Sequence, residues 1–243
     1  MRLLNKVSIV TGAGRGIGYA TVKKFLEEGS FVVACDISPE LVDRLKEELS
    51  FDQRGMAFLV DVTDSAAVEK VVETVIDNYG RIDVLVNNAG IVRDARMVNM
   101  SNDAFDAVID VNLKGAFLCA REVSRAMAKR RSGHILFISS FSALHPPVGQ
   151  ANYSAAKSAL LGMMKSMAQE LGRRNVRVNA VIPGFMDTKM TAALSDQIKQ
   201  DVLGPHVLGR YNTPEAVADF ITYLHQHMPH TSGQVFNLDS RIV

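Results

Sequence analysis

The fold of this chain is decided by the stretch Val7-Ser8-Ile9-Val10-Thr11-Gly12-Ala13-Gly14-Arg15-Gly16-Ile17-Gly18. Residues 7–10 are a β-branched run typical of a buried strand, and the glycines precede an amphipathic helix that ends at about residue 28. This order predicts a backbone that turns tightly and approaches a pyrophosphate at the helix N-terminus. The glycine spacing is GxxxGxG rather than GxGxxG, so a glycine-rich connector without a ligand is the alternative.

A second predicted strand, over 31–35, ends in Asp36. A carboxylate at this position can accept hydrogen bonds from a ribose diol and would repel a 2′-phosphate. Asp36 therefore favours NAD(H) as the cofactor. Arg15 could offer its guanidinium to that phosphate, so NADP(H) stays open.

Strand and helix patterns alternate along the rest of the chain. Further strands are expected over 56–60, 82–86, 134–138, 176–181 and 234–237, and helices over 39–49, 65–79, 102–129, 153–173 and after Thr213. Such alternation implies parallel strands with right-handed crossovers and a ligand beyond the strand carboxyl ends. We expect a single-domain α/β fold over 1–243, a Rossmann-type doubly wound parallel sheet of about seven strands with helices on both faces. A helical segment over 189–208 is expected to be a substrate lid.

Polar and small residues follow several of the predicted strands. Asp61-Val62 could hold the adenine edge, although Asp61 could instead cap the next helix, a position for which Asp64 competes. Asn87-Asn88-Ala89-Gly90 suits a backbone that closes on a ligand. Asn112 lies inside the helix predicted over 102–129, where it either tolerates an interface or marks a kink that frees a carbonyl to hold water.

Tyr153-Ser154-Ala155-Ala156-Lys157 opens the helix predicted over 153–173. A tyrosine and a lysine four residues apart stand on one helix face, so the ammonium can favour the phenolate and lower the tyrosine pKa. The alternative is a half-buried core tyrosine beside a solvated lysine. Ser139-Ser140 ends the strand over 134–138, where a hydroxyl could face a bound carbonyl.

Composition limits the partners of the chain. Of 243 residues, 27 are Lys or Arg and 26 are Asp or Glu, and a net charge of +1 gives no field that would gather nucleic acid or an anionic membrane. Cys35 and Cys119 lie in apolar segments without metal spacing and are expected to be buried thiols. No signal peptide or membrane-spanning run is found, so a cytoplasmic protein is expected. His225, His227 and His230 lack carboxylate or cysteine support and are expected to be exposed rather than metal-binding.

The motifs TGAGRGIG, Asp61-Val62, NNAG, Asn112, Ser140, YSAAK and Pro183-Gly184 occur in order over essentially the whole chain. In this the chain resembles the short-chain dehydrogenase/reductase family. Within that family it is most similar to the 3-oxoacyl-[acyl-carrier-protein] reductases, on the segments 87–94, 111–115 and 149–157.

The resemblance implies a catalytic set of four residues. Ser140 would hold the substrate oxygen, Tyr153 would transfer the proton, Lys157 would hold the nicotinamide ribose and lower the tyrosine pKa, and Asn112 would retain a water. Ser140 takes the serine role because it lies thirteen residues before Tyr153. Including what the residues indicate directly, the expected cofactor contacts are Gly12, Arg15, Gly16, Ile17, Gly18, Asp36, Asp61, Val62, Asn88, Ala89, Gly90, Tyr153, Lys157, Pro183, Gly184, Met186 and Thr188.

The expected reaction is the NAD(P)H-dependent reduction of a 3-oxoacyl thioester in fatty acid biosynthesis. The resemblance also implies a homotetramer and an acyl carrier protein docked through Arg131 and Arg174, although both arginines could simply be solvated helix ends. The chain departs from the pattern of these reductases in two places. They usually prefer NADPH, whereas Asp36 favours NADH. They also tend to end in an Asp-Gly-Gly segment, where this chain has Asp239-Ser240-Arg241. The alternatives are an NAD-dependent dehydrogenase of another secondary alcohol and a non-catalytic dinucleotide-binding protein.

Overall fold

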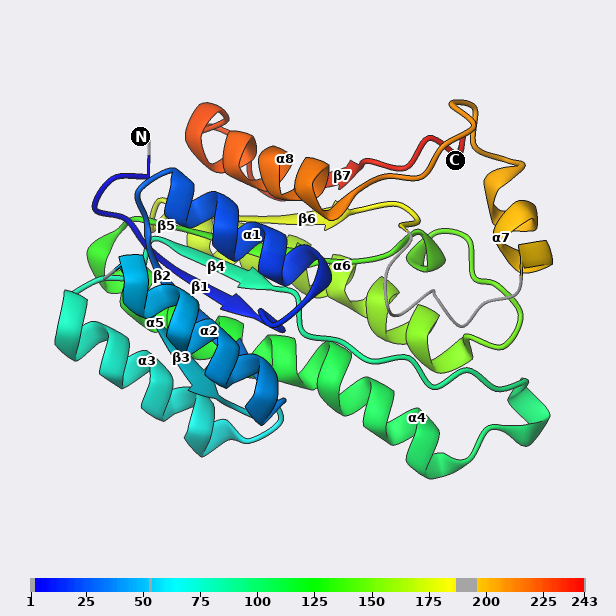
Figure 1. The fold of residues 1–243 in the computed structure, drawn as a ribbon, viewed down its shortest axis with the longest axis horizontal. Helices are drawn as coiled ribbons and strands as arrows, with labels where there is room; N and C mark the ends of the chain where they lie inside the picture. Colours follow the sequence, from blue (N-terminus) through cyan, green and yellow to red (C-terminus); the bar gives the residue numbers. More distant parts are fainter. Residues whose placement is uncertain (1–2, 53, 187–195, 243) are drawn as a thin grey trace.

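The computed structural model describes residues 3–52, 54–186 and 196–242. In these residues seven strands form one parallel sheet in the order β3-β2-β1-β4-β5-β6-β7 (Figure 1). Their bounds are β1 Val7–Thr11, β2 Phe31–Asp36, β3 Gly55–Leu59, β4 Val84–Asn87, β5 Gly133–Ile138, β6 Val176–Ile182 and β7 Val235–Asn237. Strand order reverses between β1 and β4, and such a switch point opens a crevice at the strand carboxyl ends. The predicted doubly wound sheet is confirmed.

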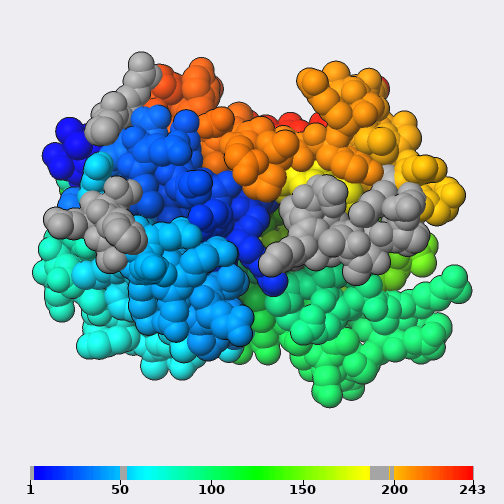
Figure 2. Space-filling model, viewed as in Figure 1, coloured from blue at the N-terminus to red at the C-terminus, as the bar shows by residue number. Residues whose placement is uncertain are grey.

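Helices cover both faces of the sheet. One face carries α1 Gly16–Glu27, α2 Pro39–Asp52 and α8 Pro214–His227, and the other carries α3 Ser65–Tyr79, α5 Ala116–Arg130 and α6 Ala151–Gly172. In the space-filling view α8, in orange, lies against α1, in blue (Figure 2). The short helices α4 Asn102–Ile109 and α7 Asp196–Leu203 lie toward the end of the sheet to which the strands point (Figure 1).

The five central strands read as apolar runs because both of their faces are buried, whereas the edge strands β3 and β7 are only half-buried. In β2, Val33 belongs to the core under α3, α5 and α6, while Val32 belongs to the core under α1, α2 and α8. Leu85 and Val84 of β4 divide between the two layers in the same way. This period of two anchors the register of the sheet and so fixes where the carboxyl ends lie.

The helix predicted over 102–129 is not continuous. A π-helical turn, η2 Asp110–Gly115, separates α4 from α5. Gly115, the last residue of this π-turn, packs closely on the loop that follows β3. A Cβ on Gly115 would lie 2.6 Å from Cγ2 of Val62. π-turns inside helices are frequent at functional sites, and this one contains Asn112. Of the predicted lid, α7 forms part, and residues 189–195 lie outside the described residues.

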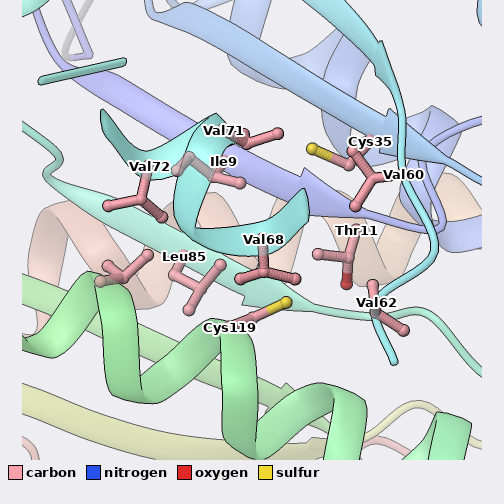
Figure 3. Close-up of a pocket in the computed structure, with 11 residues that line it drawn as sticks. Ile9, Thr11, Cys35, Val60, Val62, Val68, Val71, Val72, Leu85 and Cys119 are labelled. Atoms are coloured by element: carbon pink, nitrogen blue, oxygen red, sulfur yellow. The ribbon is translucent and has the colours of Figure 1, made fainter. Parts of the chain in front are cut away.

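A small apolar cavity of about 20 Å³ lies between α3, α5 and the sheet (Figure 3). Cys35 of β2 and Cys119 of α5 lie on its wall, together with aliphatic side chains (Figure 3). Both thiols are buried as predicted, and burial raises the pKa of Cys119 to about 12. Within the described ranges, every helix is too short or too polar to cross a bilayer.

Candidate active site

The carboxyl ends of β1, β2 and β4 open into a cleft of about 690 Å³, a size typical of ligand pockets. Its wall includes most of the predicted cofactor contacts: Gly12, Arg15, Gly16, Ile17, Asp36, Asp61, Val62, Asn88, Ala89, Gly90 and Met186. These residues end or follow five different strands, β1, β2, β3, β4 and β6. These eleven of the predicted cofactor residues are therefore brought together around one cleft.

The glycine loop is packed too tightly for side chains. Gly12 has φ +61°, and a Cβ there would lie 2.9 Å from Cα of Ala89. A Cβ on Gly18 would lie 2.1 Å from the carbonyl oxygen of Gly12, and Gly16 has φ +54°. Gly18 thus lets α1 start directly against the turn, with its N-terminus toward the cleft. This cradle fits a dinucleotide pyrophosphate.

Asn88 supports the glycine turn with its side chain. Its Nδ2 donates to the carbonyl oxygens of Thr11 and Gly12, both at 3.0 Å. The hydroxyl of Thr11 in turn accepts hydrogen bonds from the backbone N–H of Asn88 and of Ala89, both at 3.1 Å. These bonds lock the loop after β4 to the loop after β1. Sequence reasoning missed Thr11, although it directly precedes Gly12.

Asp36 closes the end of the cleft where the adenosine ribose is expected. Its Oδ2 accepts from the backbone N–H of Gly14 at 2.8 Å, and its Oδ1 accepts from that of Ser38 at 3.0 Å. The Asp36 residue is 9% exposed and Arg15 is exposed. Arg44 of α2, which carries no motif, also lines the cleft and donates to the carbonyl oxygen of Gly14 at 2.5 Å. Its position on the helix that follows Asp36 is the one sequence signal that could have identified Arg44 as a cleft residue.

Asp61 and Asp64 both follow β3, and either could have capped the next helix. Asp64 caps α3 by accepting from the backbone N–H groups of Ala66 and Ala67, at 2.9 and 3.1 Å. Asp61 accepts from Thr63 and lies on the wall of the cleft. The capping alternative therefore belongs to Asp64, and Asp61 is left at the position expected for adenine contact.

Lys157 lies behind Gly90, which lines the cleft, and like Tyr153, Ser140 and Asn112 it is not itself part of the cleft wall. The residue is 4% exposed, and its Nζ donates to the carbonyl oxygen of Ile138, at the end of β5, at 2.8 Å. A Cβ on Gly90 would lie 3.6 Å from this Nζ and 3.2 Å from Oδ1 of Asn112. Lys157, Gly90 and Asn112 therefore meet beside the loop after β4. Burial lowers the pKa of Lys157 to about 8.

Tyr153 lies one helical turn before Lys157 on α6, with the ammonium 5.7 Å from the ring centroid. Burial raises the pKa of the phenol, a hydrogen bond with Ser140 lowers it, and the Asp94 carboxylate raises it, so that the net pKa lies above its ordinary value. Desolvation of the phenol is the largest of these causes and Lys157 is not among them, so the expected lowering of the tyrosine pKa by Lys157 stays a prediction.

The two serines after β5 have different surroundings. Ser139 is 2% exposed and donates its hydroxyl hydrogen to the carbonyl oxygen of Lys157 at 3.0 Å. Ser140 is the N-cap of the short 3-10 helix η3 Phe141–Ala143 and accepts from the backbone N–H of Ser142 at 3.1 Å. Ser140 is thus the serine that acts on the pKa of Tyr153, and its catalytic role stays a prediction.

Asn112 does not point its amide at the cleft. Its Oδ1 accepts from the backbone N–H of Ile91 at 2.7 Å, and its Nδ2 donates to the carbonyl oxygen of the same residue at 2.9 Å. The side chain is therefore a two-bond clip on the loop after β4. The π-turn, rather than a simple kink, places it there.

The turn after β6 carries the residues expected at the nicotinamide end. Gly184 has φ +82°, and the carbonyl oxygen of Pro183 accepts from Nδ2 of Asn212 at 2.8 Å. Met186 lines the cleft, whereas Thr188 lies outside the described residues. Pro183 and Gly184 thus shape this side of the site through their backbone.

Two predictions concern residues far from the cleft. Arg131 donates to the carbonyl oxygen of Arg173 at 3.0 Å, so the ends of α5 and α6 form one exposed basic surface that includes Arg174. This surface lies about 30 Å along α6 from Tyr153.

The prediction of an exposed histidine run is wrong for His225. The ring of His225 stacks on the ring of buried His134, with the two centroids 5.6 Å apart. Burial lowers the pKa of His225 to about 4.

Comparison with known proteins agrees with this geometry. The sequence profile of the family described as short chain dehydrogenase matches residues 6–199. The chain is 45% identical to the 3-oxoacyl-[acyl-carrier-protein] reductase FabG of Thermotoga maritima, with 100% of both chains covered. It is 40% identical to the 3-oxoacyl-[acyl-carrier-protein] reductase of Synechocystis sp., covering 99% of this chain and 98% of that one.

A solved structure has the same fold. The crystal structure of gox2181 superposes with a TM-score of 0.94 at 29% identity, covering 98% of this chain and 96% of that one. Profile, full-length relatives and fold all indicate the same family. The chain belongs to the short-chain dehydrogenase family.

Proposed function

We propose that this protein reduces a 3-oxoacyl thioester to the 3-hydroxyacyl form with NAD(P)H. The observation that carries the proposal is the placement of the Tyr153 ring 5.7 Å from the ammonium of buried Lys157, behind Gly90 in the wall of a glycine-cradled cleft. Full-length similarity to enzymes named 3-oxoacyl-[acyl-carrier-protein] reductase supports the thioester as the substrate class.

Each residue has a separable task. A bound nicotinamide supplies the hydride, and the protein supplies orientation and a proton. Ser140 orients the ketone oxygen, and Tyr153, whose raised pKa keeps its proton at neutral pH, donates that proton to it. Lys157 holds a cation beneath the ring, and Asn112 holds the loop after β4 in place.

Apolar side chains support an acyl substrate over a sugar. Met97 and Val98 are exposed by 72% and 89%, and Val148 by 87%. Their segments are joined, because the backbone N–H of Ala95 donates to the carbonyl oxygen of Gly149 at 2.9 Å. Val207 and Leu208, after α7, are also exposed. Exposed apolar side chains of this kind suit contact with an acyl chain.

The finer predictions on cofactor and partners belong to the same proposal. Asp36 favours NADH, while Arg15 leaves NADPH possible. Carrier docking on Arg131 and Arg174 would have to serve a neighbouring chain, because these residues lie about 30 Å from Tyr153 of the same chain. That requirement fits the homotetramer expected from the sequence.

The test is the initial rate with acetoacetyl-CoA, using NADH and NADPH in parallel. We expect turnover with at least one cofactor. Tyr153→Phe should lose at least about a hundredfold in kcat while binding the cofactor as well as the unchanged protein does. No turnover with either cofactor would contradict the thioester proposal.

The alternative, which Asp36 supports, is an NAD-dependent dehydrogenase of another secondary alcohol, and turnover on a panel of alcohols would reveal it. Tight NAD(H) binding without turnover on any carbonyl would indicate a non-catalytic protein.

A further inference from the structure

The segment after β7, Leu238–Asp239–Ser240–Arg241, is here called the C-terminal strap. Its Asp239 side chain is fully buried and accepts from the backbone N–H and Nε of Arg241, at 2.8 and 2.9 Å, and from Nη2 of the same residue. A carboxylate that accepts three bonds from one arginine fixes the direction of the guanidinium. Arg241 is thus held rigidly rather than free to follow solvent.

The fixed guanidinium lies on the serine turn. Its Cζ is 3.6 Å from the centroid of the Phe141 ring, and the ring of His145 stacks on the same ring with a centroid distance of 4.7 Å. Phe141 is the first residue of η3, and its neighbour Ser140 is the N-cap of that turn. A cation over an aromatic face is attracted by the ring quadrupole. Arg241 therefore holds the turn from which Ser140 projects.

The strap also holds two other walls of the site. A Cβ on Gly184 would lie 3.2 Å from Cα of Asp239, so the turn after β6 rests directly on the strap. After α7, the backbone N–H of Val207 donates to the carbonyl oxygen of Ser240 at 3.3 Å, and Nδ1 of His206 lies 2.9 Å from the Ser240 hydroxyl. The nicotinamide-side turn, the segment after α7 and the serine turn thus share one support.

From these contacts we propose that Arg241 is a positioning residue, which orients the Ser140 hydroxyl toward Tyr153 by clamping Phe141. This proposal rests on the catalytic roles proposed above. The alternative is that the strap merely adds stability to the C-terminal end of the fold. The two differ in one respect: only positioning changes the chemistry of Tyr153 in molecules that remain folded.

The variant that tests the proposal is Arg241→Met, which keeps the length of the side chain and removes its charge. We expect kcat per folded molecule to fall about tenfold, the equivalent of about 1.4 kcal/mol, while the Kd of the cofactor stays within about twofold. The folded fraction is counted by cofactor-binding stoichiometry. Arg241→Lys, which keeps a cation, should recover part of the loss. Arg121→Met is the matched control, because Arg121 lies 5.3 Å over the ring of Phe117 on α5.

A second readout needs no substrate. The hydrogen bond from Ser140 lowers the pKa of Tyr153, so displacement of Ser140 should raise that pKa further. It is measured by the ultraviolet titration of tyrosinate, with Tyr153→Phe as the difference reference. If the unchanged protein fails on acetoacetyl-CoA, the proposed function fails, yet this titration still tests the clamp. Unchanged kcat or an unchanged Tyr153 titration in Arg241→Met would overturn it. Should that variant fail to fold, Arg241→Lys is subjected to both measurements.

Discussion

The Nζ of Lys157 donates to the carbonyl oxygen of Ile138 at 2.8 Å from a position that is almost closed to solvent. Burial lowers the pKa of Lys157 to about 8, against about 10.4 for an ordinary lysine. Between these two pH values the unfolded chain binds more protons than the native one, so stability rises with pH in that window. Below pH 8 the full cost of the buried ammonium is present.

We therefore expect Lys157→Met to raise the free energy of unfolding by up to about 3 kcal/mol at pH 6, and to lose most turnover. The gain should shrink toward zero as the pH approaches 10.5. Urea unfolding at several pH values measures it. A variant that is less stable than the unchanged protein at pH 6 would show that the hydrogen bond to Ile138 outweighs desolvation.

Gly18→Ala should prevent dinucleotide binding or folding, because its Cβ would lie 2.1 Å from the carbonyl oxygen of Gly12. Either α1 or the glycine turn must move. In Gly172→Ala the Cβ would meet nothing within 4 Å, and a helical alanine is more favourable than glycine by up to about 1 kcal/mol. Thermal unfolding and NADH fluorescence compare the pair. Equal cofactor binding by the two variants would show that the cradle does not depend on this close approach.

Asp36→Asn tests the origin of cofactor preference. The amide keeps one oxygen for the backbone N–H of Gly14 or Ser38 and removes the charge that would repel a 2′-phosphate. Removing a repulsion of about 1–3 kcal/mol should improve the ratio of NADPH to NADH affinity by about tenfold to a hundredfold. The Kd of each cofactor is measured by fluorescence titration. An unchanged ratio would assign the preference to Arg15 or Arg44, whose own variants would then be compared.

Local patterns predicted the sheet because its five central strands are buried on both faces and helices make the crossovers. The glycine loop, Asp36 and the Tyr153–Lys157 pair could be placed for the same reason, since each directly follows or opens a predicted element. In contrast, the π-turn at Asp110–Gly115 could not be predicted. It depends on Asn112 reaching Ile91, a contact between loops that periodicity does not encode.

The direction of the Tyr153 pKa shows the same limit in electrostatics. Spacing on a helix indicates that Lys157 is near, but not how deeply both groups are buried. Desolvation depends on the whole surrounding fold, and here it is the largest cause acting on the pKa of both groups. Arg241 was visible only as a departure from Asp-Gly-Gly, since its contact with Phe141 spans a hundred residues of sequence.

Asn112→Asp should make the clip on Ile91 sensitive to pH. The residue is 1% exposed, and the change would set a carboxylate oxygen in place of Nδ2, facing the carbonyl oxygen of Ile91. Two facing acceptors without a proton between them destabilise a buried site, here by about 3 kcal/mol at pH 7. The proton restores a donor, so the carboxyl pKa should be raised in the folded state. The loss should then be small near pH 4 and grow as the pH rises through the unfolded value of about 3.9 toward the raised folded one. Asn112→Leu, which cannot titrate, is the control and should lose similar stability at both pH values. Urea unfolding at pH 4.5 and pH 7 separates the two variants, and an equal loss for Asn112→Asp at both would mean that this amide does not donate to Ile91.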